Sequence, residues 1–399
     1  MNQSNNFSGK PVISQLLKFI PRDLVYRTAA RHGSDRYVKT FKTYDHLITL
    51  LYSVLSDCTS LRELSTALLA CEGKLNHLGI DYFPKRSTLA DANVRRGNQV
   101  FADIYYSLLK NYRPLLSDSC RIGVPVNKLF VADSSTIQLF SDVLKGAGRN
   151  PFNGKKKGGL KIHTLMQANE DVPCLVNMSS AATNDHRFLS TIHLPKDSWL
   201  VFDKGYTDYR YYAELSEKEI FFVTRQRENA VYDSIEEFDI ADDAPDQLLK
   251  DEHIHIIKDG LKLCLRRIAW MDEKGNKCFE FITNNFSVPA QRIAAVYKQR
   301  WQIELLFKRL KQNFSLKYFL GDSTNAIMIQ VWVCLIAHLI LKIIQIKSNK
   351  RKWSFSNLTA LIRFHLMSYI RLFDFLKNPF ASFENLTTKH LGQQLLFDT

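Results

Sequence analysis

Two aspartates come directly after short apolar runs that have the composition of buried strands. Asp133 follows Leu-Phe-Val-Ala at 129–132, and Asp203 follows Trp-Leu-Val-Phe at 199–202. In α/β proteins, functional sites gather where strands end at the edge of a sheet. An aspartate in that position is also a common turn or capping residue. Either aspartate alone is therefore compatible with a purely structural role.

A third carboxylate, Glu304, lies in a basic segment that has a helical pattern. Tyr297, Arg300, Glu304 and Lys311 are separated by three, four and seven residues. At 100° per residue they project within about 60° of one another on one helix. A single acid among basic residues is expected if the carboxylate binds a metal ion while its neighbours hold phosphates. The alternative is that Glu304 pairs with Arg300 or Lys308 at i,i+4 spacing.

Three carboxylates in basic surroundings suit two-metal phosphoryl transfer. Two Mg²⁺ ions about 3.5–4 Å apart activate the attacking oxygen and stabilise the leaving oxygen. Mg²⁺ prefers hard oxygen ligands and is held by only a few carboxylates. The residues therefore predict a Mg²⁺ site, with Mn²⁺ as an alternative ion, at Asp133, Asp203 and Glu304.

The charge of the chain indicates a polyanionic partner. The 399 residues carry 54 basic and 40 acidic side chains, a net charge of +14, and the isoelectric point is near 9.3. Nucleic acid is the first candidate for such a partner and a membrane surface the second. Seven scattered cysteines without a Cys-x-x-Cys pair argue against a disulfide framework and against a structural zinc site.

The elements that must position these residues change in type along the chain. Residues 11 to about 120 have helical spacing, and a break near 79 precedes a basic segment ending at Arg95 and Arg96. That pattern is compatible with a helix-turn-helix DNA-binding module or with an ordinary helical bundle. Short strands follow from about 127, a hairpin is expected within 230–285, and helices return from 290.

One long apolar run, at 326–341, could be a membrane span or a buried helix. It is nearly long enough to span a membrane, which requires about 20 apolar residues. Gln330 and His338 interrupt it, and Lys342 ends it. We expect a helix buried in a large core. The sequence therefore predicts a cytoplasmic protein with no membrane association, and association with the nucleoid when DNA is bound.

Further basic and aromatic residues are candidates for DNA contact. Residues 145–161 carry six basic side chains and five glycines and no acid. This composition indicates a flexible loop that holds phosphates, or a solvated surface loop. Trp301 is a candidate for stacking on a base displaced from the duplex, or for packing in the core. The predicted DNA contacts outside the three carboxylates are Tyr297, Arg300, Trp301, Lys311, Lys155, Lys156, Lys157, Lys161, Arg95 and Arg96.

The sequence resembles the DDE transposases of bacterial insertion sequences, in the branch with a Tyr-x2-Arg-x3-Glu-x6-Lys signature (insertion-sequence family four). The four residues spaced along the basic helical segment fit that signature without a gap. Asp133 in Val-Ala-Asp-Ser-Ser-Thr resembles the first catalytic aspartate of the family. Asp203 in Phe-Asp-Lys-Gly-Tyr resembles the second. The stretch 11–96 resembles a helical module often found ahead of this catalytic domain.

The resemblance implies an α/β fold with an RNase H-like catalytic core. It divides the chain into an all-α, DNA-binding domain at 1–120, the catalytic domain at 121–345 with a β-rich insertion at about 225–288, and a helical C-terminal region at 346–399. It implies cleavage at the ends of an insertion sequence, a hairpin intermediate and strand transfer into target DNA. The implied partners are double-stranded DNA, as terminal inverted repeats and target, and a second copy of the chain on the paired ends.

Two other functions stay open at this point. One is a metal-dependent nuclease without strand transfer. The other is a DNA-binding regulator whose carboxylates are vestigial, against which the three intact acids argue.

Overall fold

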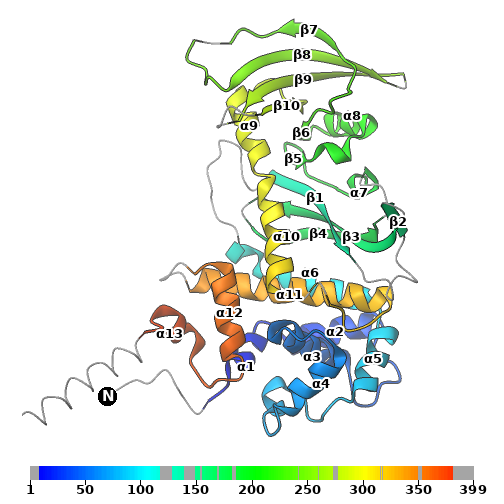
Figure 1. Cartoon of the computed structure of the whole chain (residues 1–399), viewed down its shortest axis with the longest axis vertical. Helices are drawn as coiled ribbons and strands as arrows, with labels where there is room; N and C mark the ends of the chain where they lie inside the picture. Colours follow the sequence, from blue (N-terminus) through cyan, green and yellow to red (C-terminus); the bar gives the residue numbers. More distant parts are fainter. Residues whose placement is uncertain are drawn as a thin grey trace, which may run out of the picture. The chain divides into compact units, whose positions relative to one another are not determined.

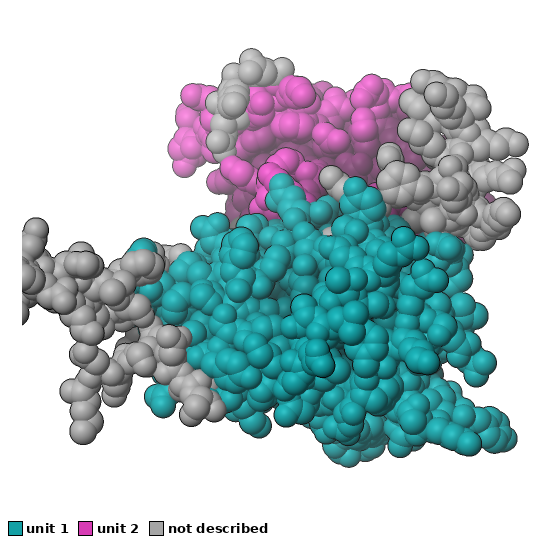
Figure 2. Space-filling model, turned by 60° about the horizontal axis from the view of Figure 1, so that its bottom comes forward, with its two compact units in different colours: residues 1–116, 309–399 teal, residues 117–308 magenta. Residues whose placement is uncertain are grey.

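A computed structural model describes residues 9–116, 128–138, 149–152, 155–168, 170–181, 186–240, 242–258, 260–272, 277–314, 316, 318–348 and 353–380 (Figure 1). The chain forms two compact units (Figure 2). Unit 1 comprises residues 1–116 and 309–399, and unit 2 comprises residues 117–308. The N-terminal and C-terminal helices thus share one unit. Helix α10 (Trp301–Asn313) begins in unit 2 and ends in unit 1.

The described part of unit 1 is built from helices. They are α1 (Val12–Leu17), α2 (Arg22–Arg31), α3 (Thr43–Ser56), α4 (Leu61–Leu69), the 3₁₀-helix η1 (Leu75–Leu78), α5 (Arg86–Arg95), α6 (Asn98–Leu116), α11 (Thr324–Lys347), α12 (Phe355–His365) and α13 (Leu372–Lys377). Helix α11 packs against α6, α3, α5 and α12. Its length and composition would allow it to cross a membrane, yet 89% of its most apolar stretch is buried against the rest of the protein. Such burial is the arrangement of a core helix.

Unit 2 is built on one large sheet. Its strands are β1 (Leu129–Gln138), β2 (Arg149–Phe152), β3 (Lys155–Gln167), β4 (Pro173–Ser180), β5 (Trp199–Phe202), β6 (Phe221–Arg225), β7 (Asp233–Glu237), β8 (Leu248–Lys258), β9 (Leu261–Met271) and β10 (Cys278–Thr283). The order across the sheet is β2-β3-β1-β5-β6-β10-β9-β8-β7, and β4 also pairs with β3. Strands β1, β5 and β6 are parallel neighbours, while the other described pairings are antiparallel.

The middle strands carry apolar side chains on both faces because helices cover both faces. Phe202 and Phe222 pack with α8 (Tyr209–Glu217) on one face. Val201 and Val223 pack with α9 (Ala290–Lys298) on the other. Strands buried on both sides read as continuous apolar runs rather than as alternating patterns. The short helices α7 (His186–Leu189) and η4 (Lys204–Tyr206) complete the described part of the unit.

The last four strands of the sheet form an antiparallel meander, β10-β9-β8-β7. Buried ion pairs lie inside it, since Arg266 contacts Asp251 while Arg267 contacts Glu252 and Glu280. The hairpin expected within 230–285 is therefore present as part of a larger antiparallel insertion. The turn between β9 and β10 includes residues 273–276, which lie outside the described residues.

Candidate active site

The parallel pairing of β1 and β5 brings the two aspartates to one level of the sheet. Ala132 is the register partner of Phe202, so Asp133 and Asp203 are the next residues on adjacent strands. Strand β5 ends at Phe202, as the sequence predicts. Strand β1 does not end at Asp133 but continues to Gln138, because its second half still pairs with β3.

From Asp133 onward, β1 pairs with β3 but no longer with β5, so Asp133 lies where the parallel pairing stops. Its carboxylate accepts a hydrogen bond from the backbone N–H of Ser134 at 2.7 Å. At Asp203 the chain leaves the sheet, and the carboxylate accepts a hydrogen bond from the Gly205 N–H at 3.4 Å at the start of η4. Both side chains are thus fixed by the backbone that follows them.

Arg300 joins the first aspartate to Glu304. Its Nη1 donates to Asp133 Oδ2 at 3.1 Å, and its Nη2 donates to Glu304 Oε1 at 2.5 Å. One planar guanidinium spans both contacts, so the two carboxylate oxygens lie no more than roughly 8 Å apart. The i,i+4 ion pair considered from the sequence is therefore present, and the same arginine also reaches the sheet.

The second aspartate is contacted by two other side chains. The Tyr297 hydroxyl donates to Asp203 Oδ1 at 3.5 Å, and Arg225 Nη2 donates to the same oxygen at 3.4 Å. Arg225 lies at the end of β6, the third parallel strand. Arg225 is not among the site residues predicted from the sequence. The available signal was a third apolar run, Phe-Phe-Val-Thr at 221–224, that also ends in a charged residue.

The segment that carries the Tyr-Arg-Glu-Lys pattern is two helices instead of one. Helix α9 ends at Lys298, and α10 begins at Trp301. Backbone bonds of the i to i−3 type bridge the junction, including Arg300 N–H to Tyr297 O at 2.9 Å. Such bonds tighten the chain locally. Tyr297 and Arg300 nevertheless both reach the aspartates, while Lys311 lies seven residues beyond Glu304, past the point where α10 enters unit 1.

Burial of the site makes the charge of Asp133 costly. Burial, together with the negative charges of Asp203 and Glu304, raises the pKa of Asp133 to about 6, although Ser134 N–H and Arg300 favour the ionised form. Asp203 and Glu304 are therefore close enough to Asp133 for their charges to oppose its ionisation. A cation shared between them relieves that repulsion, and hard oxygen donors are the ligands that Mg²⁺ prefers. The donor set fits a divalent metal ion.

An apolar pocket of about 480 Å³ adjoins these residues. Aromatic rings line it from the sheet and from the helices, namely Trp270, Phe279, Phe281, Tyr297 and Trp301. Trp301 has 58% of its surface exposed, which excludes the alternative that it is a core aromatic. The pocket could not be predicted from the sequence, because its walls come from strands and helices that are far apart in the chain.

The other residues predicted to contact DNA differ in their surroundings. Arg96 is only 4% exposed, and its guanidinium contacts Asp35, Thr43 and the Phe41 carbonyl. We therefore do not propose it as a DNA contact. Arg95 is exposed and pairs with Asp91 at 2.8 Å.

The basic stretch at 145–161 is a hairpin in its described part. Strand β2 pairs with the start of β3, and positions 155–157 belong to that pairing. The side chains of those three lysines lie outside the described residues, as do positions 145–148. Lys161 lies further along β3, opposite Thr136 of β1.

Comparison with known proteins shows the family. Residues 125–340, more than half of the chain, match the family described as Transposase DDE domain. The chain belongs to the DDE transposases. Residues 8–81 also match a family described as a domain of unknown function (DUF4372). DDE transposase domains generally use divalent metal ions, in agreement with the carboxylate site.

Curated relatives of this transposase come from several bacteria. A Sinorhizobium fredii protein named as transposase y4zB is 32% identical over 65% of this chain and 71% of its own length. A Synechocystis protein named as the transposase of insertion sequence element IS4SA is 26% identical over 65% and 72%. A Geobacillus stearothermophilus protein named as the transposase of IS5377 is 21% identical over 62% and 66%. The chain is thus a transposase of the bacterial insertion-sequence type.

Among solved structures, the chain is similar to a piggyBac transposase determined by cryo-electron microscopy as a synaptic complex with hairpin DNA. The similarity covers 90% of this chain and 80% of that one, with 13% sequence identity and a TM-score of 0.42. A likeness this distant supports no argument about the site.

Proposed function

We propose that this transposase cuts the ends of an insertion sequence and joins them to target DNA by metal-dependent phosphoryl transfer. The observation that carries the proposal is the convergence of Asp133, Asp203 and Glu304, with Arg300 bonded to two of them. Mg²⁺ held there, or Mn²⁺ in its place, would supply the Lewis acid that activates the attacking oxygen and stabilises the leaving one.

The chemistry consists of exchanges of P–O bonds. In the first, the oxygen of water forms a bond to phosphorus and the bond to the 3′ oxygen breaks, which leaves a 3′-OH and a 5′-phosphate. Next, the 3′-OH attacks a phosphodiester of the opposite strand, which forms a hairpin at the element end and releases the flanking DNA. Water then opens the hairpin and regenerates the 3′-OH, which attacks a phosphodiester of the target. Each joining step makes one P–O bond and breaks one, so no external energy source is required.

We assign the core that carries these carboxylates to the RNase H-like class. Its support is the succession β4-β3-β1-β5-β6, with three antiparallel strands followed by two strands parallel to β1. In this proposal β7 to β10 form the β-rich insertion between Asp203 and Glu304. Helices α8 and α9 cover the two faces of the parallel strands.

The side chains around the carboxylates are assigned to the DNA strand end. Arg300 offers a planar fork for bidentate phosphate contact and Tyr297 a hydroxyl donor. Lys311, further along α10, is assigned to the phosphates for its compact charge. Trp301 and the aromatic pocket beside it suit a base that has left the duplex, because stacking tolerates any base and contributes about 1–3 kcal/mol. Exposed Arg95 and the lysines at 155–157 and 161 are assigned to more distant phosphates.

We further propose that two copies act together on paired ends and that the protein works in the cytoplasm on the nucleoid. A net charge of +14 supports association with DNA. The helical domain ahead of the catalytic core is assigned to the terminal inverted repeats.

The test is cleavage and joining on short duplexes that carry the inverted repeats flanking the gene, with Mg²⁺ and the full chain. Asp133→Asn, Asp203→Asn and Glu304→Gln should each abolish cleavage while DNA binding persists. Glu217→Gln, an exposed carboxylate on α8, is the matched control and should retain activity. Nicking without joining by the unmodified chain would favour the nuclease, and binding without cleavage would favour the regulator.

A further inference from the structure

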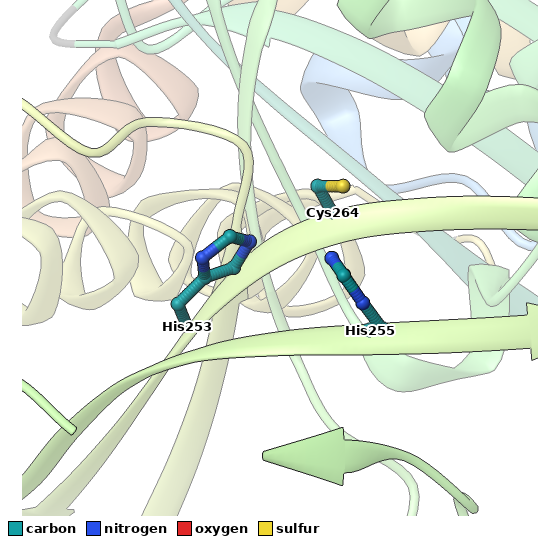
Figure 3. Close-up of side chains that lie close together, drawn as sticks. All are labelled: His253, His255 and Cys264. Atoms are coloured by element: carbon teal, nitrogen blue, oxygen red, sulfur yellow. The ribbon is translucent and has the colours of Figure 1, made fainter. Parts of the chain in front are cut away.

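Three metal-binding side chains gather in the antiparallel insertion, on strands β8 and β9. His253 and His255 alternate along β8 and therefore project from the same face of the sheet. Cys264 on β9 is the direct register partner of His255. Figure 3 shows the two imidazoles and the sulfur facing one another.

Their donor atoms are close to the spacing of a metal site. One ligand atom from each residue lies within 4.8 Å of the other two. A tetrahedral zinc ion with bonds of about 2.0–2.3 Å brings its ligand atoms to roughly 3.5 Å from one another. Cys264 is exposed and both histidines are half-buried, so rotation of the side chains can close the remaining ångström.

The surroundings of His253 supply a second, independent observation. Its Nε2 is buried, and within the described residues no hydrogen bond is assigned to it. The ring is held by edge contacts to His255 and Phe286, each with a centroid distance of 5.2 Å. A buried imidazole nitrogen without a partner is costly unless something binds it. A metal ion shared with His255 and Cys264 would satisfy it.

We propose that His253, His255 and Cys264 bind one Zn²⁺ ion. Imidazole and thiolate are ligands that suit zinc, whereas the carboxylates of the active site suit Mg²⁺. Three protein ligands leave one coordination position for water. Asp233 on β7 lies opposite His255 and its negative charge acts on that ring, while Lys262 acts on it with the opposite sign.

The site would tie β8 to β9 within the insertion. The proposal differs from the expectation that the chain has no structural zinc site, which rested on the absence of paired cysteines. A His-x-His on one strand with a single cysteine on the next gives no Cys-x-x-Cys signal, because the only cysteine lies nine residues beyond the second histidine. The proposal does not depend on the assignment of the active site.

The experiment titrates the full chain with Zn²⁺ and, separately, with Co²⁺ as a spectroscopic probe, in excess Mg²⁺ so that the carboxylate site is occupied. We expect one equivalent of either ion and a thiolate-to-cobalt charge-transfer band. His255→Ala and Cys264→Ser should each weaken Zn²⁺ binding by more than about 100-fold, because loss of an outer-shell partner alone costs 10–100-fold. Cys264→Ser should also remove the charge-transfer band.

The matched control is Cys278→Ser, which replaces another exposed cysteine, on β10. It should leave Zn²⁺ affinity and the cobalt spectrum unchanged. Alkylation of the unmodified chain gives a readout that needs no variant, since Zn²⁺ should protect Cys264 and leave Cys278 reactive. Equal alkylation of both cysteines with and without Zn²⁺, or a cobalt spectrum that Cys264→Ser does not alter, would overturn the proposal.

Discussion

Asp133→Asn should stabilise the protein at neutral pH when metal is removed by a chelator. The pKa of Asp133 is raised from 3.8 to about 6 by burial and by its acidic neighbours. A raised carboxyl pKa means that the folded state holds the proton more tightly than the unfolded state does. That stabilisation is fully present below pH 3.8 and is lost as the pH rises through 6. Each pKa unit corresponds to about 1.4 kcal/mol, so the loss reaches roughly 3 kcal/mol by pH 7.

Asparagine resembles the protonated carboxyl and does not titrate. The unfolding free energy of Asp133→Asn should therefore exceed that of the unmodified chain by up to about 3 kcal/mol at pH 8, by about half of this at pH 5, and by almost nothing at pH 3. Asp133 is 16% exposed, so solvent screening reduces the figure only modestly. The measurement is urea unfolding in EDTA at several pH values, with hydrogen exchange of β1 to report on unit 2.

Added Mg²⁺ should narrow the difference in stability between the two proteins at pH 8 to about half. Binding to the folded state at ten times the dissociation constant adds about 1.4 kcal/mol, and the variant should lose that gain. Glu217→Gln controls for removal of a carboxylate and should change stability by less than about 0.5 kcal/mol at every pH. Equal stability of Asp133→Asn and the unmodified chain at pH 8 in EDTA would refute the claim that this buried charge is costly.

Three further outcomes are expected. Arg300→Lys keeps the charge but replaces the planar fork with a single ammonium group. It should slow hairpin formation and joining by about 10- to 100-fold while initial DNA binding stays near normal, as assayed step by step. Replacing the lysines at 155–157 with alanine should flatten the salt dependence of DNA affinity by about 0.9 log units per log of salt for each lost contact, and an unchanged slope would exclude the hairpin from the interface. Arg267→Met leaves the buried Glu252 with Lys250 as its remaining cation and should lower the unfolding free energy by about 3 kcal/mol in urea titrations.

The two strands that precede Asp133 and Asp203 could be predicted from the sequence. Apolar runs of four residues at 129–132 and 199–202 are adjacent parallel strands, and the residues after them are level. Their composition shows burial on both faces, which confines charged side chains to the positions where the parallel pairing stops. Helix α11 was predictable for the same reason, since an apolar run that polar residues interrupt fits a crowded core better than lipid.

Features that depend on contacts between distant segments could not be predicted. Arg96 follows a basic pattern that favours DNA contact, yet a pocket around Phe41 and Thr43 buries it. The turn between α9 and α10 leaves no mark on the periodicity, because Gln299 and Arg300 are ordinary helix formers. The aromatic pocket beside Trp301 needs β9 and β10 to pair and α9 to pack on that face of the sheet, and neither contact can be predicted from the sequence.

Arg300 can be both a salt-bridge partner of the carboxylates and a contact for phosphate. Its guanidinium contacts Asp133 and Glu304, which are the carboxylates that a divalent ion would also neutralise. Each carboxylate has about four lone-pair positions, so an ion could bind while both salt bridges stay in place. The guanidinium has five N–H donors and these two contacts use only two of them, so the others could hold a phosphate beside the ion. The salt bridges therefore hold the arginine where the proposed phosphate clamp needs it, whereas a lysine lacks the planar fork that both tasks use.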